Sequence, residues 1–173
     1  AVYLVTLFTG MREGEVLGLT WDCIDFKSGT ITIKQQLQKV RGTGGEYILA
    51  PTKNGKSRIV APAKYVMQIL TRQRKTQNEQ RLKAGPAWSN PLDLVFTNSL
   101  GKNLCAQTVY LHFKKLAAEA GVPDARFHDL RHSYAVAALR SGDDIKTVQE
   151  NLGHHTAAFT LDTYAHITDQ MRK

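Results

Sequence analysis

The sequence predicts an α+β domain that is mostly helical and carries one small antiparallel sheet. In the second half of the chain, apolar residues recur at helical spacing over three stretches, residues 105–121, 127–140 and 143–153. β-branched residues alternate with polar ones over residues 30–37, as in a half-buried strand. Asn54-Gly55, a strong signal for a hairpin turn, stands between two further β-rich runs.

The first elements follow from local pattern. The apolar opening predicts a helix that runs to Phe8 and is stopped by Thr9-Gly10, and a second helix is expected from about Glu13. Its buried side would carry Val16, Leu17 and Leu19. A Ser-Gly turn then leads into a strand from about Thr30 to Leu37.

Residues 46–62 are expected to form the hairpin, with Lys53 at its tip. A lysine at that point could reach whatever the sheet faces.

The rest of the chain is predicted to be helical with short interruptions. Residues 64–84 form a helix that is polar in its second half, 84–91 a loop and 93–96 a short strand. The helix over 105–121 ends at Gly121, and the acid-started helix over 143–153 is closed by Gly153. Residues 154–167 would complete the fold as a short helix or turns.

The positive charge is concentrated in one tract. The net charge is +8 and the pI about 9.6. Residues 53–83 hold nine Lys/Arg against one acid, Glu79, which leaves 14 basic and 14 acidic residues elsewhere. We interpret the tract as a surface for a polyanion, and the alternative is a helix that lysines keep soluble. The candidate contact residues are Lys56, Arg58, Arg72, Arg74 and Lys75.

Length and composition exclude several classes of protein. The chain has 173 residues and 42% hydrophobic content, which suits one globular domain. The apolar opening covers eight residues, too few to span a bilayer, so no membrane association is expected. Cys23 and Cys105 form neither a metal spacing nor a disulfide framework, which fits a reducing cytosol. Because no initiator methionine is present, we expect a fragment of a longer protein.

The stretch FHDLRH at 127–132 allows two chemical interpretations. In the first, His128 and His132 are metal ligands four residues apart and Asp129 is a hydrolytic base. Possible third ligands are His154, His155 and Asp162, which form no recognised pattern. The alternative is a purely structural role, in which these histidines pack against a helix or cap it.

In the second interpretation, the stretch binds a phosphodiester without a metal. His128 and Arg131 are three residues apart and share a helix face. Arginine can donate paired hydrogen bonds to phosphate oxygens, and histidine can move protons near neutral pH. Arg12 stands at a helix start, where its charge opposes the macrodipole and where a bound phosphate would resolve the conflict.

The order of motifs along the chain decides between these interpretations. TGMREGEVLGLTWDCIDF, PTKNGKSRIVAP, HDLRHSYA, NLGHH and LDTYAHI follow one another. In this order they resemble the tyrosine recombinase (phage integrase) family over nearly the whole chain. The similarity is greatest to the catalytic domain of integrases from conjugative transposons and phages.

The resemblance implies a role for each matched residue. Arg12 and Arg131 would hold the scissile phosphate and neutralise its growing charge, and His128 would handle the proton of the nucleophile. Lys53 would protonate the 5′ leaving oxygen, with Lys56 as the nearby rival. His154 would donate a hydrogen bond to a phosphate oxygen, whereas the adjacent His155 would have no such role. Tyr164 would be the nucleophile, forming a 3′-phosphotyrosyl bond without metal, ATP or any cofactor.

The resemblance also marks departures and open alternatives. Gly14 replaces a common serine, and Glu15 retains the usual acid. Residues 1–173 would be the catalytic domain alone, without an N-terminal core-binding domain or the extreme C-terminus. The implied partners are double-stranded DNA, other protomers in a tetrameric synapse and accessory DNA-bending or excision factors. A type IB topoisomerase and a non-catalytic DNA-binding relative remain alternatives.

Overall fold

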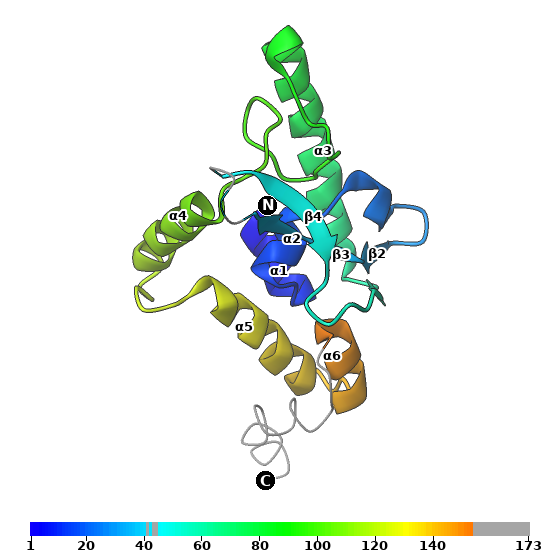
Figure 1. Cartoon of the computed structure of the whole chain (residues 1–173). Coiled ribbons are helices and arrows are strands. Elements are labelled where there is room, and N and C mark those ends of the chain that lie inside the picture. The colour runs from blue at the N-terminus through cyan, green and yellow to red at the C-terminus, as the bar shows by residue number, and fades with distance from the viewer. Residues whose placement is uncertain (41, 43–44, 154–173) are drawn as a thin grey trace.

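The computed structural model describes residues 1–40, 42 and 45–153, and the predicted α+β class is confirmed (Figure 1). The helices of the described residues are α1 Val2–Thr9, α2 Glu13–Leu17, α3 Lys64–Ala84, α4 Ala106–Glu119, α5 Phe127–Arg140 and α6 Ile145–Leu152. Two short 3₁₀ turns lie at Trp21–Cys23 and Gly85–Ala87. No helix in these residues is both long and apolar enough to cross a membrane.

The strands form two antiparallel sheets where the sequence predicted one. β1 Ile24–Asp25, β2 Thr30–Ile33 and β5 Arg58–Val60 make a three-stranded sheet in the order β1-β2-β5. β3 Gln35–Lys39 and β4 Tyr47–Pro51 make the second sheet. The predicted strand over 30–37 is therefore two strands that separate at Lys34.

The close packing of β3 on α2 explains this separation. A side chain at Gly18, just after α2, would collide with the backbone of Gln36 and Leu37. β3 thus lies directly against the end of α2, whereas Ile31 and Ile33 of β2 point into the core and pair with Val60 and Arg58 of β5.

The predicted hairpin over 46–62 is wrong as a pairing, although both strands and the turn exist. β4 pairs with β3, with Leu49 opposite Leu37, and β5 pairs with β2, with Val60 opposite Ile31. Gly55 has a φ of 68° and its N–H donates to the Thr52 carbonyl, so the turn forms as expected. It connects two sheets rather than two strands of one sheet.

The predicted strand at 93–96 is also wrong. Leu94 makes only an isolated bridge with Thr20, and the Gln77 amide of α3 donates to the carbonyls of Leu94 and Val95. The apolar run is buried because it fills the core beneath α3, not because it joins a sheet.

The predicted glycine stops after α4 and α6 are confirmed, whereas α2 ends at Leu17, so Leu19 is buried just outside that helix. The Asp144 carboxylate accepts the Thr147 N–H at the start of α6, and Gly153 closes that helix in the left-handed conformation with a φ of 62°. Gly121 likewise follows α4 with a φ of 78°.

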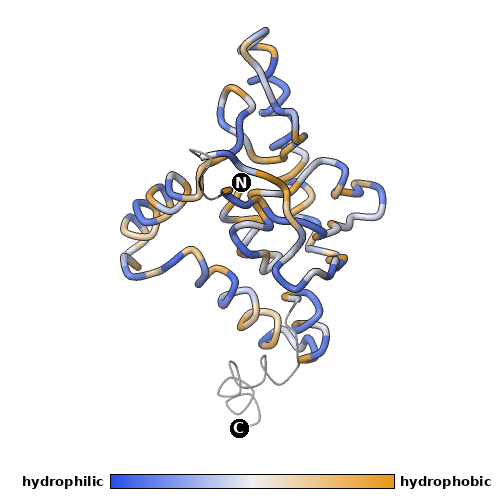
Figure 2. The backbone as a smooth tube through the Cα atoms, viewed as in Figure 1, coloured by the Kyte–Doolittle hydropathy of each residue, from blue (hydrophilic) through white to orange (hydrophobic). Residues whose placement is uncertain are grey.

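The buried residues form two hydrophobic clusters. The larger joins α1, α2, both sheets, α3, α4 and Phe127 at the start of α5. The smaller contains Ala135, Ala138, Leu139, Val148 and Leu152 from α5 and α6. Figure 2 shows hydrophobic residues gathered where α1, α2 and the strands meet, and a mostly hydrophilic far part of α3. α5 therefore begins in one cluster and ends in the other.

Candidate active site

The C-terminal end of α6 collects three arginine side chains. Arg58 Nε donates to the Asn151 carbonyl at 2.7 Å, and Arg131 Nη2 to the Leu152 carbonyl at 2.6 Å. Arg12 Nη2 donates to the Gly153 carbonyl at 3.3 Å. The last carbonyls of a helix lack intrahelical partners and carry the negative end of the dipole, so they attract cations. Guanidinium groups from distant parts of the sequence thus meet at one place.

Arg12 is held at the start of α2 by Glu15. The Arg12 backbone N–H donates to Glu15 Oε2 at 2.9 Å, and its Nη1 donates to Glu15 Oε1 at 2.9 Å. Glu15 is the third residue of the helix, where an acid stabilises both the free N–H groups and the dipole. This acid offsets the unfavourable position of the Arg12 charge that the sequence indicated.

Glu15 also binds Arg58, from β5. Arg58 Nη2 donates to Glu15 Oε2 at 2.6 Å and Nη1 to Oε1 at 3.0 Å. Glu15 is only 1% exposed. Burial opposes its ionisation, but the hydrogen bonds and charges of Arg58 and Arg12 outweigh burial and lower the pKa of the Glu15 carboxyl.

Arg58 was predicted to contact DNA, and its geometry opposes that role. The side chain is 10% exposed, and its Nε, Nη1 and Nη2 donate to Asn151 and Glu15. Arg58 is therefore not a residue of the DNA surface. It binds Glu15, the acid that also holds Arg12.

Arg131 lies between the two hydrophobic clusters. It is 3% exposed, and Nη1 donates to the Gly10 carbonyl at 2.6 Å while Nη2 donates to Leu152. Gly10 ends α1 with a φ of 66°, and a Cβ there would collide with Tyr134 and Leu152. A guanidinium presents its five N–H donors as a planar fork, a geometry that suits paired hydrogen bonds to carbonyl or phosphate oxygens.

His128 and Asp129 diverge at the start of α5. His128 is accessible to solvent on one side, and on the other its ring meets that of His132 edge to face with 4.8 Å between centroids. Partial burial and the neighbouring charges of His132 and Arg131 lower the pKa of His128, so its imidazole is neutral near pH 7. A neutral imidazole can accept a proton.

Asp129 is occupied as a helix cap. Its Oδ2 accepts the Arg126 backbone N–H at 2.8 Å, and its Oδ1 accepts Arg126 Nη2 at 3.0 Å. The metal-hydrolase interpretation needed this carboxylate as a base beside the two histidines. Within the described part of the chain, no three His, Cys, Asp or Glu side chains are grouped as a metal site.

Lys53 and Lys56 both lie in the turn between β4 and β5, and both are exposed. The turn reaches the same helix end as the arginines, because Asn54 Nδ2 donates to the Gly153 carbonyl at 3.3 Å. Lys53 and Arg12 are therefore brought to one side of α6. His154, His155, Asp162 and Tyr164 lie outside the described residues.

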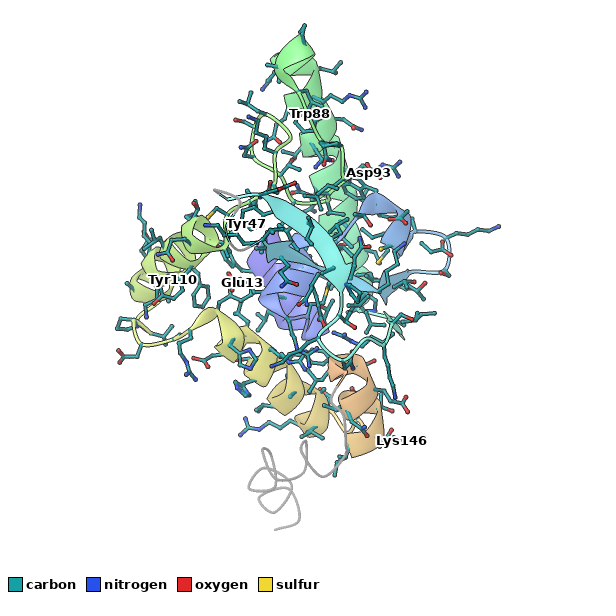
Figure 3. The ribbon with its side chains drawn as sticks, viewed as in Figure 1. Glu13, Tyr47, Trp88, Asp93, Tyr110 and Lys146 are labelled. Carbon is teal, nitrogen blue, oxygen red and sulfur yellow. The ribbon has the colours of Figure 1, made fainter. Side chains whose placement is uncertain are left out.

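The predicted basic residues of α3 divide by position. Arg72 and Lys75, three residues apart, are exposed on the same side of the helix. The Arg74 guanidinium instead lies over the Trp21 and Phe26 rings, 5.7 and 5.8 Å from their centroids. Arg74 also lines a cavity of about 510 Å³ with Trp88 and Asp93. Figure 3 shows these two beside α3 and Lys146 of α6 at the opposite end of the molecule.

Sequence reasoning missed two supports of the site, Arg58 and Asn54. Glu15 could have been recognised as more than a retained acid, because a glutamate three residues after a helix start is a capping signal. Nothing local indicates that Arg58 turns inward, since its partners come from α2 and α6.

Comparison with known proteins gives consistent matches. The Phage integrase family matches residues 1–171. A tyrosine recombinase XerC-like protein of Caldanaerobacter subterraneus subsp. tengcongensis is 32% identical over 99% of this chain and 46% of its own length. The ICEBs1 integrase of Bacillus subtilis is 26% identical over 99% of this chain and 45% of its own. The chain thus spans about half the length of these curated relatives.

Solved structures share the fold. The Tn1549 transposon integrase in complex with transposon right end DNA superposes with a TM-score of 0.77 at 21% identity, over 94% of this chain and 52% of that chain. The XerA recombinase does so with a TM-score of 0.70 at 22% identity, over 99% and 57%. The predicted family is confirmed: the chain belongs to the phage integrase family of tyrosine recombinases.

Proposed function

We propose that the chain is the catalytic domain of a site-specific DNA recombinase of a mobile element. The observation that carries the proposal is the meeting of Arg12 and Arg131 at α6. Their guanidinium groups donate to the successive carbonyls of Gly153 and Leu152. Two convergent arginines suit the non-bridging oxygens of one phosphodiester.

The proposed reaction is a transesterification. The Tyr164 hydroxyl attacks the phosphorus, a new P–O bond forms to the tyrosine, and the bond to the 5′ oxygen breaks. His128, whose lowered pKa keeps it neutral, accepts the tyrosine proton, and Lys53 gives a proton to the departing 5′ oxygen. His154 would add a hydrogen bond to the phosphate. The number of phosphate ester bonds does not change, so the reaction consumes no ATP.

The proposed partners follow from this chemistry. Duplex DNA would bind across the arginine site, with the exposed Arg72 and Lys75 of α3 and Lys56 of the turn contacting the backbone. A full recombination would require four protomers, a DNA-clamping domain outside these residues and accessory DNA-bending or excision factors. Such a reaction takes place in the bacterial cytoplasm, on the nucleoid.

The test is covalent trapping on a pool of duplexes that carry 5′-bridging phosphorothiolates, in EDTA. Sulfur leaves without a general acid and religates poorly, so an SDS-resistant adduct should accumulate with the chain and vanish with Tyr164→Phe. An adduct unchanged by Tyr164→Phe would contradict the assignment. Duplex binding without an adduct would favour the non-catalytic alternative, and relaxation of supercoiled plasmid without strand exchange would favour the topoisomerase.

A further inference from the structure

The turn that carries Lys53 is organised by the side chain of Asn54. Asn54 Oδ1 accepts the Lys56 backbone N–H at 3.2 Å and lies 2.9 Å from the Thr52 hydroxyl. The same hydroxyl lies 2.7 Å from the Lys56 carbonyl, so its proton can go to either acceptor. Thr52 is buried, whereas the Lys53 side chain is exposed. The Asn54 oxygen therefore fixes the shape of the turn.

The other end of the same amide fixes the place of the turn. Asn54 Nδ2 donates to the Gly153 carbonyl at 3.3 Å, and Arg12 Nη2 donates to that carbonyl at the same distance. One oxygen atom is thus shared by the lysine turn and by an arginine of the phosphate site. The Gly153 backbone is itself constrained, because it is left-handed and a Cβ would lie 3.0 Å from Arg58 Nη1.

Lys53 has no comparable anchor of its own. Its ammonium group makes no hydrogen bond or ion pair with any of the described residues, so its position depends on the backbone of the turn. The side chain carries four rotatable bonds, and only a backbone held near the phosphate would keep the ammonium within reach of a leaving oxygen.

We infer that Asn54 is a positioning residue, which sets the distance between the Lys53 ammonium and the phosphate held by Arg12. The inference rests on the proposed function, in which Lys53 protonates the 5′ oxygen. Asn54 would bind neither DNA nor the reacting atoms. Its two amide atoms divide the task, with Oδ1 shaping the turn and Nδ2 attaching it to α6.

The inference predicts a defect that depends on the leaving group. When the P–O bond breaks, the 5′ oxygen must gain a proton, which Lys53 supplies. When a P–S bond breaks instead, the thiolate leaves unprotonated and needs no acid. A misplaced Lys53 therefore slows the first cleavage and spares the second, whereas a damaged arginine site slows both.

The experiment uses two duplexes that differ by one atom, 5′-bridging oxygen or sulfur, with a sequence selected from the trapped pool. Each duplex is nicked so that the released strand dissociates and the adduct accumulates. Asn54→Asp is the informative variant, because it keeps the acceptor for Thr52 and Lys56 but replaces the Nδ2 donor by an oxygen. Asn54→Ala removes both functions, and Lys53→Ala sets the full loss of the acid. Gln107→Ala, at an exposed amide of α4, is the control.

We expect Asn54→Asp and Asn54→Ala to form the adduct about 100-fold more slowly on the oxygen duplex, as for loss of a general acid. On the sulfur duplex they should stay within about threefold of the wild-type rate, which also shows that the site is folded. Equal losses on both duplexes, or none on the oxygen duplex, would overturn the inference. If the wild-type chain forms no adduct on either duplex, the proposed function fails first, and the inference fails with it.

Discussion

At the scale of the residue, Glu15 is the acid on which the arginine site depends. It accepts hydrogen bonds from Arg58 and from the backbone and side chain of Arg12, and it is almost fully buried. Glu15→Gln should lower the free energy of unfolding by about 3–5 kcal/mol, because it leaves the partly buried guanidinium groups of Arg12 and Arg58 without their counter-ion. Chemical denaturation of the variant and the wild type at pH 7 measures the difference.

The pH dependence separates this charge effect from a packing effect. Because the pKa of Glu15 is lowered on folding, its contribution is complete above about pH 4.5 and is lost as the pH falls through the folded value. The stability gap between Glu15→Gln and wild type should therefore narrow in acid. Glu79→Gln on the exposed face of α3 should change stability little at any pH. A gap that does not vary with pH would argue against the charge effect.

The sequence indicated candidate residues for the site, but not their contacts. Arg12, Lys53, His128 and Arg131 were found from motif order, and the structure gathers Arg12, Arg131 and the Lys53 turn at the end of α6. The inward turn of Arg58 could not be predicted, since a strand residue faces the core or the solvent according to its sheet. That sheet depends on residues far along the chain.

At the scale of the element, α3 carries basic residues with two different environments. Arg72, Arg74 and Lys75 are all exposed, but the Arg74 guanidinium also lies over the Trp21 and Phe26 rings. If Arg72 and Lys75 contact DNA, replacing both by Gln should reduce the slope of log affinity against log salt by about 1.8, near 0.9 for each lost phosphate contact. Binding titrations over a range of salt concentrations measure the slope.

Arg74→Gln is the matched control for this experiment. It should leave the salt slope almost unchanged and cost about 0.5–1 kcal/mol of stability, the usual value of an exposed cation–π contact. If the salt slope changed with Arg74→Gln but not with the double replacement of Arg72 and Lys75, DNA would contact Arg74 and not the proposed pair.

Helices were predicted better than strands for a physical reason. The ends of α5 and α6 depend on neighbours within one or two turns, such as Asp144 and Gly153, and these are visible in the sequence. Strand pairing depends on distant residues. Asn54-Gly55 correctly indicated a turn, but the local pattern could not show that β4 pairs with β3 and β5 with β2.

At the scale of the whole molecule, the two hydrophobic clusters suggest two units of different stability. The smaller cluster involves only α5 and α6, so we expect it to open without unfolding the rest. Leu70→Ala in the larger cluster should lower the protection of α3 and β2 amides by about 2–5 kcal/mol and leave α6 amides unchanged. Native-state hydrogen exchange measures both.

Leu152→Ala tests the same division from the other side. Leu152 is fully buried in the smaller cluster, and its contacts are lost in local and in global opening. The variant should therefore lower protection in α6 and in α3 alike. If Leu70→Ala lowered the protection of α6 as well, the chain would unfold as one cooperative unit.

The separation of the strands into two sheets has a mechanical consequence for Lys53. The tip of a hairpin is free to move relative to its sheet. The turn after β4 is instead attached at its two ends to different sheets, through β4 and through β5. The chain passes between the two sheets twice, at Lys34 and at residues 52–57. Two sheets joined by two short connections have few possible relative motions, and sliding past one another is one of them. A relative displacement of the two sheets would therefore move Lys53. The rate at which Lys53 moves would be set by the motion of the sheets, not by local motion of the turn.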